Sequence, residues 1–222
     1  MEPQINNNNE EKPKFYYTKL EEESPIKPMY RDSWDRKIPF EQLSRKLIED
    51  FNSVISEFYR RKSKKNISKQ LVYYAIALLH LYNGTRISEA VEAFKKWLVK
   101  NENEIEVRVR KRKEGVFRIV LVPDILKFNR AIIERAISYG FNNNLDLITT
   151  RNVKKWFSTW LNINSHTCRK AWESFAARTT KGDVTKITSW QGRKRVDSHL
   201  VYLRREEFKE EFKKILDYYF KI

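Results

Sequence analysis

An apolar helix near the middle of the chain constrains the fold more than any other sequence feature. Over residues 69–82, apolar side chains would surround most of a helix instead of forming one stripe along it. They are Leu71, Val72, Ala75, Ile76, Leu78 and Leu79. Ser68 suits the N-cap of this helix, and Asn83-Gly84 would end it. Because such a helix has little polar surface, we expect other elements to pack around it on several sides.

Helical periodicity dominates the rest of the chain, with one exception. Helices are predicted from about 41 to 58 and over 87–94, 124–139, 152–162, 166–179, 184–191, about 196–203 and 205–221. The exception is a pair of alternating apolar and polar runs, 105–109 and 116–122, on either side of Lys113-Glu114-Gly115. Trp97-Leu98-Val99 is a candidate third strand. The prediction is an α+β fold, mostly helical, with a small antiparallel sheet whose hairpin spans about 104–122.

The chain divides into an arm and one domain. Residues 1–40 lack steady periodicity and contain a run of asparagines and several prolines, which is typical of a flexible N-terminal arm. Residues 41–222 can form a single domain with a substantial core, since 41% of the 222 residues are hydrophobic. An apolar stripe near the end predicts a C-terminal helix within 203–222.

The charge of the chain favours one class of partner. The formal net charge is +16, and many of the cations fall in three clusters, 60–65, 108–113 and 193–195. Clustering of this kind favours a nucleic-acid partner. A solvated basic surface without a partner is the alternative.

Several other classes of protein are disfavoured. No apolar run has the length of a membrane span, and Met1-Glu2-Pro3-Gln4 does not begin a secretory signal. Cys168 is the single cysteine, which excludes an internal disulfide and a cysteine metal cluster. No carboxylate or Cys/His group has metal-ligand spacing. We therefore expect a cytoplasmic protein with no membrane partner and no metal site.

Three motifs and a late tyrosine carry the candidate chemistry. They are Tyr82-Asn83-Gly84-Thr85-Arg86-Ile87-Ser88-Glu89-Ala90, Ser165-His166-Thr167-Cys168-Arg169, Gln191-Gly192-Arg193 and Tyr202. In this order they resemble the conserved boxes of the tyrosine recombinases, or phage-type integrases, and the hairpin ending at Pro123 resembles that of the same family. The resemblance covers about 41–205 and implies the tyrosine-recombinase catalytic-domain fold. It is divergent, as in integrases of archaeal mobile elements.

The two motif arginines suit a reaction at a DNA phosphate. Arg86 and Arg169 offer planar, permanently charged guanidinium groups that stabilise charge on the non-bridging oxygens. Glu89 could orient Arg86, or simply form an ion pair with it three residues along a helix. His166 lies three residues before Arg169, on the same side of one helix. By resemblance His166 assists proton transfer or binds the phosphate; a capping or core histidine is the alternative.

The remaining candidates follow from the resemblance. Tyr202 would be the nucleophile that forms a 3′-phosphotyrosine bond, the alternative being a core aromatic residue. A hairpin lysine would be the general acid, either Lys113 or Lys111. The whole 108–113 run could instead contact the DNA backbone. Arg193 stands where the family usually has histidine; it keeps the positive charge but cannot act as a base near neutral pH.

These features predict a site-specific DNA recombinase or integrase that cuts and rejoins strands without a cofactor. Its expected partners are double-stranded DNA and other copies of itself, as a dimer or tetramer on DNA. The resemblance implies that the C-terminal helix docks on a neighbouring copy, whereas packing on its own domain is the alternative. About 40 residues before the domain are too few for the family's usual core-binding domain. The alternative functions are a catalytically inactive or partner-dependent DNA-binding regulator, and a topoisomerase or resolvase with the same chemistry.

Overall fold

The computed structural model describes residues 38–109, 117–180, 190 and 213–220. The elements in chain order are α1 (Phe40–Arg60), α2 (Lys65–Asn83), α3 (Ile87–Lys100), β1 (Glu104–Arg108), β2 (Phe117–Leu121), α4 (Asp124–Phe128), α5 (Arg130–Phe141), a short 3-10 helix (Leu145–Leu147), α6 (Thr150–Trp160) and α7 (Ser165–Thr179). Residues 213–219 are also helical. The predicted α+β class, mostly helical with a small antiparallel sheet, is confirmed.

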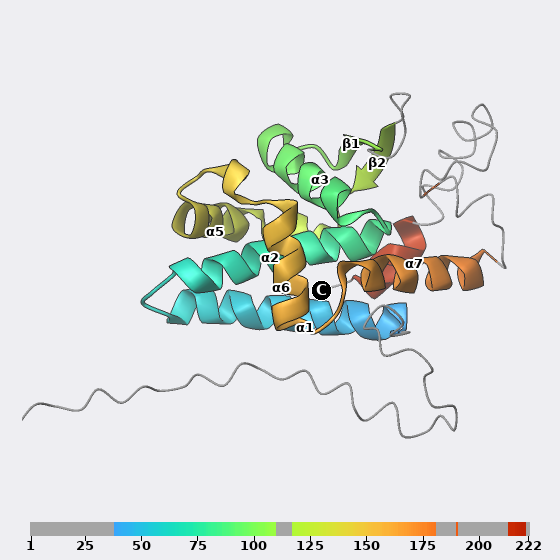
Figure 1. Ribbon diagram of the computed structural model, residues 1–222, viewed down its shortest axis with the longest axis horizontal. Coiled ribbons are helices and arrows are strands. Elements are labelled where there is room, and N and C mark those ends of the chain that lie inside the picture. The colour runs from blue at the N-terminus through green and yellow to red at the C-terminus, as the bar shows by residue number, and fades with distance from the viewer. Residues whose placement is uncertain (1–37, 110–116, 181–189, 191–212, 221–222) are drawn as a thin grey trace, which may run out of the picture.

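Helix α2 is the centre of the fold, as its sequence predicts. Its residues from Leu71 to Asn83 are all buried. Helices α1, α3, α5 and α7 all pack against it, and α1 runs beside it through the body of the molecule (Figure 1). Because α2 packs against so many elements, the position of its C-terminal end is well defined, and the candidate site lies next to that end.

The start of α2 differs from the prediction. The helix begins at Lys65, so Ser68 lies inside its first turn and is fully buried instead of capping it. Ser68 lies against Gly140 of α5, where an added Cβ would come within 3.1 Å of the Ser68 Cβ. A small side chain is needed there because the two helices approach closely. Packing, not capping, therefore explains this serine.

The two predicted strands form an antiparallel pair. Their register runs from Glu104 opposite Leu121 to Arg108 opposite Phe117. The proposed third strand at Trp97-Leu98-Val99 is wrong, because α3 continues to Lys100. Trp97 is buried and its ring contacts that of Phe94, one helical turn earlier, with centroids 5.9 Å apart. This side chain continues the buried face of α3 and so keeps the segment helical.

The helix predicted over 124–139 is interrupted. Asn129 adopts φ −100° and ψ 13°, which separates α4 from α5, and its side-chain amide donates to the Ile125 carbonyl at 2.8 Å. The predicted helices over 152–162 and 166–179 are found as α6 and α7, capped by Thr149 and Asn164. Apart from Trp190, the helices predicted over 184–191 and 196–203 lie outside the described residues, as does the N-terminal arm up to residue 37.

The described C-terminal segment packs on its own domain. Phe220 lies edge-on to Tyr82 of α2 with ring centroids 5.0 Å apart, and Tyr219 meets Phe175 of α7 at 5.4 Å. The Tyr82 hydroxyl donates to Asp217 Oδ1 at 2.5 Å. Docking of this segment on a neighbouring copy stays a prediction. Among the helices that the structure describes, none is both long and apolar enough to cross a membrane.

Candidate active site

Gly84 brings helix α7 against the turn that joins α2 to α3. It ends α2 in the left-handed conformation, with φ 55°. A Cβ at this position would lie 2.5 Å from the Trp172 ring of α7, closer than side-chain carbons approach one another. The Trp172 indole also donates to the Tyr82 carbonyl at 3.1 Å. Glycine is therefore required here for both its backbone conformation and its size.

Asn83 fixes the same turn to the sheet. Its side-chain amide donates to the Leu121 carbonyl, and its Oδ1 accepts from the Leu121 N–H, both at 2.8 Å. The Asn83 side chain thus forms the same pair of hydrogen bonds with Leu121 that the backbone of a neighbouring strand would form. The Asn83 carbonyl in turn accepts from Arg118 Nη2 at 3.0 Å and from the Trp190 indole at 3.1 Å. In the sequence, Asn83 indicates only a helix end, and its pairing with β2 was missed.

A buried carboxylate holds Arg86 at the start of α3. Glu89 is fully buried, and its Oε1 accepts from Arg86 Nη1 at 2.8 Å while its Oε2 accepts from the Arg86 backbone N–H at 3.0 Å. The ion pair considered from the sequence is therefore present. One quarter of the Arg86 side chain stays exposed to solvent. A guanidinium group held in this way can still meet an anion at the surface.

A second arginine joins this cluster. Arg118 of β2 is buried, with Nη1 3.5 Å from Glu89 Oε2. Arg118 was not among the site residues predicted from the sequence. The sequence feature that could have indicated its role is a charged side chain at a strand position that the alternating pattern predicts to face the core. The single carboxylate of Glu89 thus faces the guanidinium groups of both Arg86 and Arg118.

His166 and Arg169 lie in the first turns of α7. Asn164 caps this helix, because its Oδ1 accepts from the His166 N–H at 2.9 Å. His166 is exposed, whereas Arg169 is buried and its Nε donates to Glu173 Oε1 at 3.2 Å. The helix therefore presents an exposed histidine beside an arginine whose position is fixed by burial and by an ion pair.

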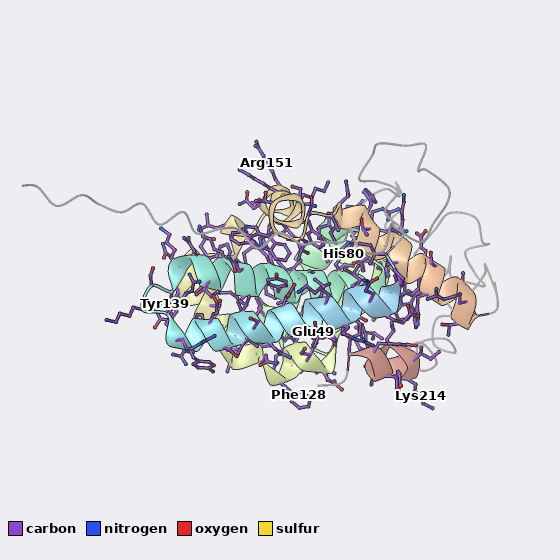
Figure 2. All side chains as sticks on the ribbon, turned by 90° about the horizontal axis from the view of Figure 1, so that it is seen from below. Glu49, His80, Phe128, Tyr139, Arg151 and Lys214 are labelled. Carbon is purple, nitrogen blue, oxygen red and sulfur yellow. The ribbon has the colours of Figure 1, made fainter. Side chains whose placement is uncertain are left out.

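His80 of α2 connects the two motifs that contain these arginines. One ring nitrogen, Nε2, lies 2.7 Å from the Ser165 carbonyl at the start of α7, and Nδ1 lies 3.3 Å from the Thr85 hydroxyl. Burial, together with the nearby positive charge of Arg169, lowers the pKa of His80 to about 4. The ring is therefore neutral, with its proton on Nε2, which donates to Ser165. Figure 2 shows His80 close to the start of α7.

The structure thus brings together some predicted site residues and leaves others undescribed. The Arg86 and Glu89 motif meets the helix that carries His166 and Arg169, through His80. Four further candidates, Lys111, Lys113, Arg193 and Tyr202, lie outside the described residues. Within 38–109, 117–180, 190 and 213–220, no group of three His, Cys, Asp or Glu residues could hold a metal ion.

The chain is similar to two proteins of known sequence. One is "Putative integrase ORF241" of Acidianus two-tailed virus, 26% identical over 189 residues that cover 84% of this chain and 70% of the viral protein. The other is an uncharacterized protein of Methanocaldococcus jannaschii, 24% identical over 162 residues that cover 64% of this chain and 71% of that protein. No protein-family model matches the chain, and no solved structure matches it significantly. The chain is therefore similar to a protein named as an integrase from a virus of archaea.

Proposed function

We propose that the chain is a tyrosine recombinase that cleaves and rejoins DNA through a phosphotyrosine intermediate at Tyr202. The observation that carries this proposal is the meeting of the Arg86 motif with the helix of His166 and Arg169, which are about 80 residues away in the sequence. Glu89 holds Arg86 while leaving part of it exposed. The similarity to a viral protein named as an integrase supports the same function.

The proposed reaction exchanges one phosphate ester for another. The Tyr202 oxygen attacks the phosphorus, its bond to phosphorus forms, and the bond from phosphorus to the 5′ oxygen breaks. Arg86 and Arg169 stabilise the negative charge that develops on the non-bridging oxygens. His166 receives or relays the tyrosine proton, and Lys113 or Lys111 gives a proton to the departing 5′ oxygen. A second 5′ hydroxyl then attacks the phosphotyrosine and restores free Tyr202.

This sequence of steps needs no nucleotide, since the energy of the broken ester is kept in the phosphotyrosine bond. Double-stranded DNA is the proposed substrate, consistent with the net charge of +16. Recombination between two duplexes breaks four strands, so self-association of the protein on DNA is part of the proposal. Arg193 would act as a third cation at the phosphate.

The test is capture of the covalent intermediate. The protein is mixed with nicked duplexes that carry candidate target sites, and protein–DNA adducts that survive SDS are separated on a gel. We expect an adduct with the wild-type protein and none with Tyr202→Phe. Tyr218→Phe is the matched control, because Tyr218 is also near the C-terminus and is exposed. It should form the adduct at the wild-type rate.

Three outcomes would contradict the proposal. An adduct that persists in Tyr202→Phe would assign the nucleophile to another residue. Tight, salt-sensitive DNA binding with no adduct on any duplex would favour a DNA-binding regulator instead. Relaxation of supercoiled DNA without strand exchange would favour a topoisomerase with the same chemistry.

A further inference from the structure

We propose that His80 is a positioning residue that holds the turn carrying Arg86 against the helix carrying Arg169. This inference rests on the proposed function, because it gives the two arginines a common task at one phosphate. His80 itself is buried in α2, so it would not contact a phosphate at the surface. Its role would be to keep the two cations at a fixed separation.

Both contacts of His80 fall next to residues of the site. Thr85, whose hydroxyl meets Nδ1, directly precedes Arg86 in the chain. Ser165, whose carbonyl accepts from Nε2, is the first residue of α7. In an α-helix the carbonyl of one residue faces the N–H four residues later, so the Ser165 carbonyl points toward the Arg169 backbone. One imidazole ring therefore contacts the side chain of the residue before Arg86 and the backbone carbonyl one helical turn before Arg169.

An apolar side chain would meet the packing needs of α2 at lower cost. Residues on either side of His80 in this helix, such as Leu79 and Leu81, are fully buried and apolar. Burying an imidazole costs free energy unless both ring nitrogens find partners. Here both do, and each partner belongs to a different motif of the site. Joining these two motifs is what a histidine can do at this position and a leucine cannot.

Burial is the main reason that the ring keeps the form that this role needs, because it lowers the pKa of His80. The charges of Arg169 and His166 lower this pKa further, whereas the hydrogen bond to Ser165 and the charge of Glu89 raise it. A neutral ring has one donor and one acceptor nitrogen. Donation from Nε2 to Ser165 leaves Nδ1 to accept from the Thr85 hydroxyl. Because the ring is buried and both of its nitrogens already have partners within the protein, His80 would not act as an acid or base in the reaction.

Three variants separate the contacts of His80. His80→Gln retains a donor near the position of Nε2, His80→Asn retains an acceptor near Nδ1, and His80→Leu removes both. Tyr74→Phe is the control for damage to α2, because it removes the 3.4 Å contact with Asp50 and leaves the site untouched. The measured quantities are the affinity for a duplex and the single-turnover rate of adduct formation.

We expect His80→Leu to bind DNA within about threefold of wild type and to form the adduct about 10- to 100-fold more slowly, since small displacements of catalytic groups reduce rates on this scale. His80→Gln and His80→Asn should each recover part of the rate, and Tyr74→Phe should match wild type. Thr85→Val should slow the wild-type protein but not His80→Leu. Equal losses in binding and rate, or additive losses for Thr85 and His80, would overturn the proposal.

A readout that does not depend on activity separates this inference from the proposed function. The side-chain Nε–H resonances of Arg86 and Arg169 are followed by NMR in the folded protein. We expect both resonances to shift in His80→Leu and to stay unchanged in Tyr74→Phe. If both stay unchanged in His80→Leu, His80 does not position the arginines, whether or not the protein cleaves DNA. If they shift while wild type forms no adduct, the proposed function fails and the positioning role stands.

Discussion

Replacing Gly84 with alanine would test how tightly α7 is held against the Arg86 turn. An alanine at φ 55° is in the left-handed region, which costs an L-residue about 1–2 kcal/mol. Its Cβ would also lie 2.5 Å from Trp172 Cδ2 and 2.7 Å from Trp172 Cε3 and Cγ. Relieving such overpacking costs about 1–3 kcal/mol more. We therefore expect Gly84→Ala to lower the free energy of unfolding by about 2–5 kcal/mol.

Urea unfolding followed by circular dichroism measures this loss, and two variants divide it into its parts. Asn142 has φ 52° on an exposed helix end, so the difference in stability between Asn142→Gly and Asn142→Ala should show the backbone cost alone. Trp172→Ala removes the ring atoms that an alanine side chain at position 84 would strike, Cγ included. In that background, Gly84→Ala should cost only about 1–2 kcal/mol.

The reasoning would be refuted by either of two results. If Gly84→Ala costs no more than the difference between Asn142→Gly and Asn142→Ala, the close approach of Trp172 is not what requires glycine. If Gly84→Ala costs the same with and without the Trp172 ring, the two residues are not coupled. In both cases another element would have to hold α7 beside the Arg86 turn.

Three further measurements test the buried charges and the basic surface. His80 has its folded pKa lowered to about 4, so the unfolded chain binds its proton more readily. The free energy of unfolding should therefore fall by about 3 kcal/mol as the pH drops from about 6.5 toward 4. His80→Leu should lose this part of the pH dependence in urea unfolding. Glu89→Gln should lower the free energy of unfolding by about 3–5 kcal/mol, because it leaves two guanidinium groups without their counter-charge. Glu92→Gln on the same helix is the control and should lower it by about 1 kcal/mol or less in the same assay. Lys62 and Lys65 are exposed and lie in the basic 60–65 cluster. If they contact phosphates, each alanine variant should lower the slope of log K against log salt concentration for DNA binding by about one. Unchanged slopes would show that this cluster is not part of the DNA-binding surface.

Most helices among the described residues, and the two hairpin strands, were predictable because their apolar periodicity is the signal that packing requires. The errors occur where a local preference disagrees with a contact between distant segments. Ser68 has a capping preference, but Gly140 approaches it from α5 and makes it a packing residue. Trp97 has a high strand propensity, but Arg130 of α5, 33 residues later, lies over its ring and donates to its backbone carbonyl at 3.1 Å. Contacts with residues far along the chain decided both cases.

The candidate site shows the same division. The motifs of Arg86 and Arg169 are short and local, so they are visible in the sequence. The residues that join these motifs are not, because each acts on a partner far along the chain. Asn83 pairs with β2, 38 residues later, and His80 reaches Ser165, 85 residues later. Such residues could be found in the sequence only as polar side chains at positions that the apolar pattern predicts to be buried.

The buried cluster around Glu89 is better explained by function than by stability. A buried ion pair seldom stabilises a fold more than apolar residues of similar volume, because its members lose their hydration. Glu89 and Arg118 nevertheless lie almost wholly inside the protein, and Arg86 is partly exposed. One carboxylate and two guanidinium groups leave these three residues with a net charge of +1. Since Arg86 is the member that reaches solvent, that charge is available to an anion arriving at the surface. Burial of the other two members keeps Arg86 in one orientation without a bound anion, which an exposed arginine could not achieve without losing side-chain entropy, and the proposed reaction would use this orientation at the phosphate.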